Sequence, residues 1–289
     1  MTKLGKIIAR SIIFLVIIFI IFFVVKKYNH SPKEEIIYKP EKTIKILEGW
    51  NIKEIGQYFE REGMWQSEEV LELIGFPQID YRKNTNLSEP KDFSLQFDFL
   101  ADKPSYYSLE GYLFPDTYRI YTDAILEEVV LKMLDNFGKK LTPQMRADIE
   151  KQGRTIYQIV IMASLIEKEA PINNNDPENR DAYIISGIFW DRLKIGQALQ
   201  SDATLSYILS DNQPQHSGQE LEVDSLYNTY KYRGLPPGPI CNPGLVALEA
   251  AIYPIYTDYN YFLTPKDSKE VIYAVNYEEH LQNKYKYLK

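Results

Sequence analysis

Apolar and polar positions divide the chain into an N-terminal apolar stretch and a long amphipathic remainder. Residues 7–25 are apolar except for Arg10 and Ser11, and Lys26 and Lys27 follow directly. A helix needs roughly 20 apolar residues to cross the hydrocarbon core of a bilayer. Beyond residue 40 the pattern changes to short alternating segments and to helices with one apolar face. The chain is therefore predicted to have an N-terminal transmembrane helix followed by an α+β body.

Two interpretations of the apolar stretch compete, a retained membrane anchor and a cleaved signal peptide. A signal peptide has an apolar region of about 7 to 15 residues followed by small residues at the cleavage site. Here bulky Phe and Val residues run directly into the two lysines, which favours an anchor. Residues 1–27 carry a formal charge of +5 and the remainder −12. More positive charge precedes the span than follows it, which predicts a cytoplasmic N-terminus and an external body.

The first part of the body is predicted to be small and mixed. Residues 28–40 are polar, contain two prolines and are typical of a linker. Residues 43–46 alternate like a half-buried strand, and Glu48-Gly49 turns the chain. Asn51 is suited to cap a helix that ends near Gly63, and a second helix follows Ser67. Residues 41–76 would form a subdomain that either binds sugar or only packs against the rest.

Residues 77–289 are predicted to form the larger α+β domain. Its helices are expected at 123–150, 155–170 and 178–193, from Ala203, from Leu245 to Ile252 and from Glu278, with strands at 261–263 and 271–275. Ser201 or Asp202 is the expected N-cap of the helix that begins at Ala203.

The helix at 155–170 carries the most informative candidate residue. Apolar residues cover nearly every face, so the helix is predicted to be buried, and Pro171 ends it. Glu167 falls on an apolar stripe, whereas Glu169 points about 200° away around the helix axis. Burial and the negative end of the helix dipole both raise a carboxyl pKa, which suits proton donation near neutral pH. The alternative is that Glu167 and Glu169 form a solvated helix end around Lys168.

Two loops combine rigidity with aromatic or polar side chains. Residues 109–118 read Leu-Glu-Gly-Tyr-Leu-Phe-Pro-Asp-Thr-Tyr, which fits either a loop lining the core or an aromatic platform for sugars. Residues 234–240 are stiffened by prolines, and fit either a structural turn or a sugar-binding loop.

Composition excludes several other kinds of chemistry. A single cysteine and three scattered histidines exclude an internal disulfide and the Cys- or His-rich metal sites. The sequence contains no basic tract, so a nucleic acid is not expected as a partner. No Gly-x-Ser-x-Gly sequence occurs, so a serine hydrolase is not supported. Neither a metal nor a cofactor is expected.

Five collinear segments resemble the endolytic murein transglycosylase, or YceG-like, family. They are Glu110–Tyr118, Ala163–Glu169, Leu199–Asp202, Tyr227–Tyr230 and Gly234–Gly244. The resemblance runs from the anchor to the C-terminus. It implies a LysM-like subdomain at 41–76, a YceG-like catalytic domain at 77–289 and a single-pass anchor in the cytoplasmic membrane.

The resemblance also implies the activity, an internal cut in nascent peptidoglycan strands that limits their length. Glu167 would be the catalytic acid. It would protonate the glycosidic oxygen of the β-1,4 bond from N-acetylmuramic acid to N-acetylglucosamine, then take the proton of the muramic acid C6 hydroxyl as a 1,6-anhydro ring closes. This needs one carboxyl group rather than the two of ordinary glycosidases, so no partner carboxylate is expected near Glu167. The expected substrate-binding residues are Glu110, Phe114, Asp116, Tyr118, Gln200, Asp202, Tyr227, Asn228, Thr229, Tyr230, Pro237 and Asn242.

One departure from the family pattern concerns the C-terminal strand. The family often has a His-x-Phe-type strand there, whereas this chain has Val271-Ile272-Tyr273, and His280 is expected on the terminal helix. The loops at 110–118, 200–202, 227–230 and 236–244 are expected to converge around Glu167. The expected partners are glycan strands, the membrane and proteins of wall synthesis. The competing function is a membrane-tethered glycan-binding scaffold without catalytic activity.

Overall fold

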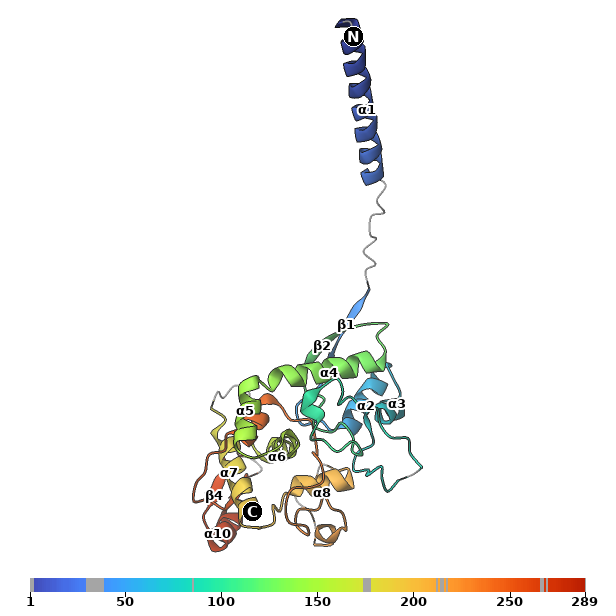
Figure 1. The fold of residues 1–289 in the computed structure, drawn as a ribbon. Helices are drawn as coiled ribbons and strands as arrows, with labels where there is room; N and C mark the ends of the chain where they lie inside the picture. Colours follow the sequence, from blue (N-terminus) through green and yellow to red (C-terminus); the bar gives the residue numbers. More distant parts are fainter. Residues whose placement is uncertain are drawn as a thin grey trace. The chain divides into compact units, whose positions relative to one another are not determined.

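The computed structural model describes residues 3–29, 39–84, 86–173, 178–211, 213, 216, 218–265, 268 and 270–288 (Figure 1). The chain divides into two compact units, residues 1–40 and residues 41–289. Most of the predicted linker at 28–40 lies outside the described residues.

The first unit contains one long apolar helix, α1 (Lys3–Asn29). An 18-residue window within Lys3–Lys27 has a mean hydropathy of 3.1, and the 25 residues of this segment are long enough to cross a membrane. A membrane anchor and a signal sequence both fit that length and composition.

The second unit begins with a strand that pairs across a long sequence distance. β1 (Glu41–Lys45) runs antiparallel to β2 (Thr117–Tyr121), with Thr43 opposite Arg119. β2 differs from the expected loop, because its residues alternate between buried and exposed positions as a strand on a core requires.

Two short helices follow β1. α2 (Ile52–Arg61) is capped by Asn51, whose side chain accepts from the Glu54 amide while the Glu54 carboxylate accepts from the Asn51 amide. α3 (Ser67–Ile74) packs against α2. The predicted strand and two helices are thus confirmed, while their LysM-like character remains a prediction.

The helix predicted over 123–150 is interrupted. It consists of α4 (Leu126–Lys140) and α5 (Pro143–Lys151). The break occurs because Thr142 has a non-helical conformation and accepts from the Met145 amide, which places Pro143 at the first position of a new helix.

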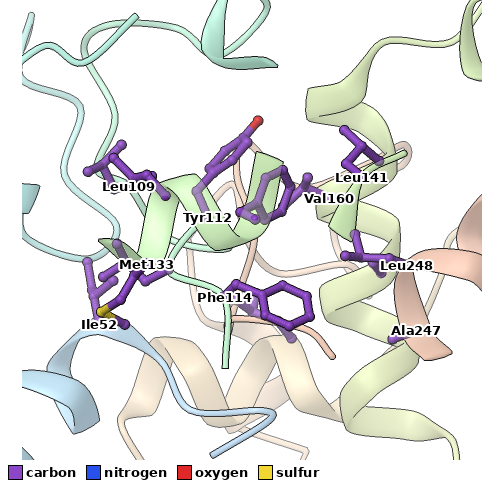
Figure 2. Packing of buried hydrophobic residues seen from close by; sticks show 14 of the residues in the cluster. Ile52, Leu109, Tyr112, Phe114, Met133, Leu141, Val160, Ala247 and Leu248 are labelled. Carbon is purple, nitrogen blue, oxygen red and sulfur yellow. The ribbon is translucent and has the colours of Figure 1, made fainter. Parts of the chain in front are cut away.

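The central helix of the body is α6 (Ile156–Glu169), with eight consecutive buried residues from Ile159 to Ile166. Its neighbours are α5 and three further helices, α7 (Arg180–Lys194), α8 (Asp202–Leu209) and α9 (Leu245–Ile252). Figure 2 shows side chains from distant elements meeting in one core, among them Ile52 of α2, Met133 of α4 and Leu248 of α9. The predicted buried helix is confirmed.

The C-terminal part is a hairpin followed by a helix. β3 (Tyr261–Leu263) pairs antiparallel with β4 (Ile272–Ala274), and α10 (Tyr277–Tyr287) follows. His280 lies on α10 as expected, with its ring stacked on Tyr261. Two short 3₁₀ helices, Asp98–Leu100 and Glu220–Glu222, complete the described elements.

Candidate active site

Glu167 lies in the last turn of α6, where the apolar stripe of the helix reaches the protein surface. Its side chain is half-buried, and its Oε2 accepts a hydrogen bond of 3.0 Å from the Gly244 amide. The helix ends at Ala170, whose amide bonds to the Ile166 carbonyl before Pro171. A carboxyl group is thus held at the end of a rigid, buried helix by one backbone donor.

The surroundings of Glu167 favour its protonated form. Burial raises the pKa of this carboxyl group to about 7, because the charged form loses hydration. The Gly244 amide and Lys168 oppose the increase, and the negative charge of Glu48 adds to it. An acid with this pKa exists in both protonation states near neutral pH, as a group that donates and later recovers a proton must.

Glu48 corrects an expectation from the sequence. No partner carboxylate was expected near Glu167, yet Glu48 reaches this site from the turn after β1. A Cβ atom placed on Gly244 would lie 2.1 Å from Glu48 Oε1, so the Glu48 carboxylate covers the residue whose amide binds Glu167. Nothing in the sequence indicates this approach, because Glu48 belongs to a turn far from α6 along the chain.

Glu169 has different partners from Glu167. Its Oε1 accepts from the Ser201 hydroxyl at 2.5 Å and from the Ala203 amide at 3.4 Å. Burial is the main cause that raises its pKa. The prediction that the two glutamates do not form one paired site is confirmed. Ser201 is the N-cap residue of α8, as one of the two expected positions, but its hydroxyl bonds Glu169 and makes no capping hydrogen bond.

Asn242 connects three segments behind Glu167. Its side chain is fully buried; Oδ1 accepts from the Leu113 amide, and Nδ2 donates to the Trp50 carbonyl and to Glu110 Oε1. Its backbone also bonds the turn after β1, since Gly49 donates to the Asn242 carbonyl and the Asn242 amide donates to Trp50. Asn242 therefore fixes the loop that carries Gly244.

Glu110 is a buried carboxyl group in the same network. It accepts from the Ile52 amide and from the Tyr207 hydroxyl as well as from Asn242. Burial raises its pKa to about 8. Both Glu110 and Asn242, which the resemblance implies as substrate-binding residues, thus make internal hydrogen bonds in this structure.

The rest of the 109–118 loop lies against β1 and α4. The rings of Phe114 and Tyr118 are buried, and the Tyr118 hydroxyl donates to the Phe114 carbonyl. Asp116 is exposed and accepts from Asn136 of α4 at 3.0 Å. At Phe114 and Tyr118 this part of the loop lines the core, which is one of the two interpretations left open by the sequence.

The expected residues at 200–202 and 227–230 form a second cluster, attached to Glu169. The Gln200 amide donates to the Thr229 carbonyl, and Gln200 has a left-handed backbone conformation with φ of 53°. The Tyr230 hydroxyl donates to Asp202 at 2.9 Å. Buried Asn228 bonds the carbonyls of Leu221 and Val223. Gln200 and Tyr230 also line a surface cavity of about 780 Å³.

The proline-rich loop runs along α6 and joins the two clusters. The Tyr157 hydroxyl donates to the Pro237 carbonyl at 2.6 Å, and the Ile240 amide donates to the buried Ser164 hydroxyl at 3.0 Å. A Cβ on Gly238 would lie 2.8 Å from the Tyr227 hydroxyl, so Tyr227 packs directly on this loop. The expected loops therefore contact α6 or one another, except for residues 116–118, which contact β1 and α4.

Comparison with known proteins identifies the family of this chain. A sequence model described as the YceG-like family matches residues 26–286. The chain belongs to the YceG-like family.

Two relatives are similar to about two thirds of this YceG-like chain. An endolytic murein transglycosylase of Bacillus subtilis (strain 168) is 38% identical over 181 residues, which cover 62% of this chain and 48% of the relative. One from Streptococcus pneumoniae (D39) is 34% identical over 189 residues, covering 64% of this chain and 33% of the relative. The aligned part therefore spans about half or a third of those proteins.

A solved structure supports the fold. The crystal structure of a yceG-like protein from Listeria monocytogenes superposes with a TM-score of 0.68 and 30% identity, and the match covers 85% of this chain and 76% of that one.

Among the described residues, no group of three His, Cys, Asp or Glu side chains could hold a metal ion. Cys241 is a buried free thiol next to Ser164, whose carbonyl accepts from it.

Proposed function

We propose that this YceG-like protein is an endolytic lytic transglycosylase that cuts β-1,4 bonds inside peptidoglycan strands. The relatives named above are endolytic murein transglycosylases, and the residues matched by the YceG-like family model, 26–286, include the site around α6. The observation that carries the proposal is Glu167: a half-buried carboxyl group with a pKa of about 7, held by one backbone amide at the end of a buried helix.

The proposed reaction uses Glu167 twice. Protonated Glu167 donates its proton to the glycosidic oxygen as the bond from muramic acid C1 breaks, leaving a free 4-hydroxyl on N-acetylglucosamine. The resulting carboxylate then accepts the proton of the muramic acid C6 hydroxyl as O6 bonds to C1. The product ends in 1,6-anhydro-muramic acid, no water is consumed, and Glu167 is protonated again.

We propose two roles for the residues that the family resemblance assigns to substrate binding. The exposed or partly exposed members contact the sugars, and these are Asp116, Gln200, Asp202, Tyr230 and Pro237. The buried members hold the loops in position, and these are Glu110, Phe114, Tyr118, Tyr227, Asn228, Thr229 and Asn242. Tyrosine rings suit sugar C–H faces, and carboxylates and amides suit sugar hydroxyls.

The location of the protein follows from the apolar helix. We propose that α1 is a single-pass anchor in the cytoplasmic membrane and that the body lies on the external side, where new glycan strands emerge. Residues 41–76 are proposed as a LysM-like subdomain. Wall-synthesis proteins are the proposed protein partners.

The decisive experiment replaces Glu167 with Gln, which keeps the shape of the side chain but cannot cycle a proton. General acid–base catalysis contributes typically about 10² to 10⁴ in rate, and a group used twice should be at the upper end. Purified uncrosslinked strands are digested with the full chain in detergent, and anhydro-muropeptides are measured by mass spectrometry. Glu150→Gln, an exposed carboxylate on α5, is the matched control, and circular dichroism confirms folding.

Four outcomes are distinguishable. The proposal is supported if folded Glu167→Gln forms no anhydro products while Glu150→Gln forms them as the parent does. Near-parental activity in that variant would remove Glu167 from the mechanism. A parent protein that binds strands but releases no product would be a scaffold, and one that releases reducing muramic acid ends would be a hydrolase.

A further inference from the structure

The turn after β1 brings a second carboxylate to the candidate active site. β1 ends at Lys45, and the Trp50 amide closes the turn on the Leu47 carbonyl. Gly49 has a φ of 77°, a left-handed conformation that glycine adopts without strain. This reversal directs the preceding residue, Glu48, toward the loop that contains Gly244.

Gly244 lies between the two carboxyl groups. Its amide donates to Glu167, while Oε1, Cδ and Cγ of Glu48 would all lie within 2.9 Å of a Cβ atom at this position. The space that any other residue would fill with its side chain is therefore occupied by Glu48. The φ of Gly244 is −76°, so close packing against Glu48, and not backbone conformation, requires glycine here.

Contacts on both sides hold the Glu48 turn against the end of α6. Lys168 donates from Nζ to the Gly49 carbonyl at 3.1 Å. The Gly49 amide donates to the Asn242 carbonyl at 3.0 Å, and the Asn242 amide donates to the Trp50 carbonyl at 2.8 Å. These bonds come from α6 and from the Gly244 loop. They hold the turn that carries Glu48 in one position.

The charged groups that act on Glu167 come from two elements. Glu48, from the turn after β1, raises the pKa of Glu167, and Lys168, its neighbour on α6, lowers it. The Lys168 ammonium group bonds the Gly49 carbonyl. From the loop before α9, Cys241 faces Glu167, and burial raises the pKa of this thiol well above its usual range, so it stays neutral.

We propose that Glu48 is a positioning residue of the reaction: its carboxylate keeps the proton on Glu167 until the leaving oxygen takes it. This inference rests on the proposed function of Glu167. Before the cut, the negative charge of Glu48 disfavours ionised Glu167 and so maintains the acid. After the proton has left, the same repulsion makes Glu167 a stronger base toward the C6 hydroxyl.

The test is the pH dependence of kcat/KM for anhydro-product formation by the full chain in detergent. The parent should lose activity as pH rises through about 7, because Glu167 loses its proton. In Glu48→Gln this alkaline limb should move to lower pH, because Glu167 loses its proton more readily without the neighbouring negative charge. Glu48→Asp, which restores the charge, should move the limb back toward the parental position.

A matched control and a second variant separate charge from structure. Glu60→Gln removes one exposed carboxylate from α2 of the same segment, and its limb should coincide with that of the parent. Gly244→Ala should displace the Glu48 carboxylate, because the new methyl group would occupy its place. Introduced into the parent, Gly244→Ala should therefore move the alkaline limb to lower pH. Introduced into the Glu48→Gln protein, it should leave the position of the limb unchanged.

The results distinguish this inference from the proposed function. If Glu167→Gln is inactive and the limb of Glu48→Gln coincides with the parental limb, the role of Glu48 is refuted while the function stands. If Glu167→Gln is active, the function itself fails. Should Glu48→Gln be too slow to profile, the ¹³C shift of the Glu167 carboxyl carbon reports the same titration directly. An unmoved titration in that measurement also refutes the role of Glu48.

Discussion

Three glutamates near the centre of the body have raised pKa values, and their hydrogen bonds distinguish their roles. Glu110 accepts from a backbone amide, a tyrosine hydroxyl and an asparagine amide, all within the core. Glu169 accepts from a serine hydroxyl and an amide. Glu167 accepts from the Gly244 amide, and it is half-buried. Structural donors from side chains and backbone therefore hold Glu110 and Glu169, whereas one backbone amide holds Glu167, which agrees with the proposed role of Glu167 as the acid.

Glu110 provides a prediction about stability and pH. Its pKa is about 8 in the folded protein and 4.5 as an unperturbed group. Between pH 4.5 and about 8, Glu110 therefore carries a proton in the folded state that it lacks in the unfolded state. The stabilisation from Glu110 is complete below about pH 4.5 and is lost as pH rises through about 8. The free energy of unfolding should therefore fall across this range, by up to roughly 1.4 kcal/mol per pH unit from this group.

The measurement is urea unfolding at several pH values, compared between the parent and Glu110→Gln. Gln stays neutral and keeps an oxygen acceptor for Ile52, so the variant should show a shallower decline. The difference between the two proteins isolates Glu110, because Glu167 and Glu169 contribute the same slope to both. Parallel curves would show that Glu110 does not titrate in this range.

At the residue scale, the sequence predicted the place of Glu167 at the end of a buried helix but missed the approach of Glu48. The place of Glu167 was predictable because an apolar stripe, a helix end and a following proline all lie within one segment. Its catalytic role comes from the family resemblance and stays a prediction. Glu48 was not predictable, because its approach depends on the contacts of Gly49 and Trp50 with Asn242. The burial of Phe114 and Tyr118 was left open for the same reason, since aromatic residues suit both a core and a sugar platform.

At the scale of elements, helices with clear apolar periodicity were predicted and non-local features were not. The expected helices around α6, α7 and α9 are confirmed. The break between α4 and α5 was missed because the apolar pattern continues across Thr142-Pro143. The new helix begins there because Thr142 caps α5. β2 was missed because a strand of five residues needs its partner β1 to be recognised.

The contact between α7 and the segment before β3 leads to a prediction about packing. A Cβ on Gly187 would lie 2.1 Å from the Ile255 carbonyl oxygen, and the Ile255 amide donates to the Tyr183 carbonyl of α7. Backbone therefore packs directly on backbone. Ala would favour the helix by about 1 kcal/mol, but overpacking costs typically 1–3 kcal/mol and occasionally more. Because the opposing atom is a main-chain oxygen, we expect Gly187→Ala to destabilise the body by about 2 kcal/mol net.

Chemical denaturation of the Gly187→Ala protein measures this change. Gly218→Ala is the control, because no atom lies within 4 Å of its Cβ position, and its midpoint should match that of the parent. A Gly187→Ala protein as stable as the parent would show that this segment moves away from α7 at little cost.

At the scale of the whole molecule, the two units have opposite electrostatic and hydropathic character. The first 27 residues carry +5 and a continuous apolar span, whereas the remainder carries −12. An acidic body is repelled by the anionic surface of a membrane, so an anchoring helix, and not surface charge, would keep it near its substrate. The same charge distribution predicts the orientation of the chain.

We expect α1 to remain attached and to leave the body outside the cytoplasm. Lys3, Lys6 and Arg10 precede the span and two lysines follow it, which favours retention of the N-terminus in the cytoplasm. Protease added to spheroplasts should therefore degrade the body and leave a small membrane fragment, while a cytoplasmic marker stays intact. Replacing Lys3, Lys6 and Arg10 with Gln leaves no basic side chain before the span and two lysines after it, so a fraction of this variant should become protected. If the body is released from the membrane as a shortened chain, α1 is a signal peptide. If the parent body resists protease until detergent is added, the orientation is the reverse of the one proposed.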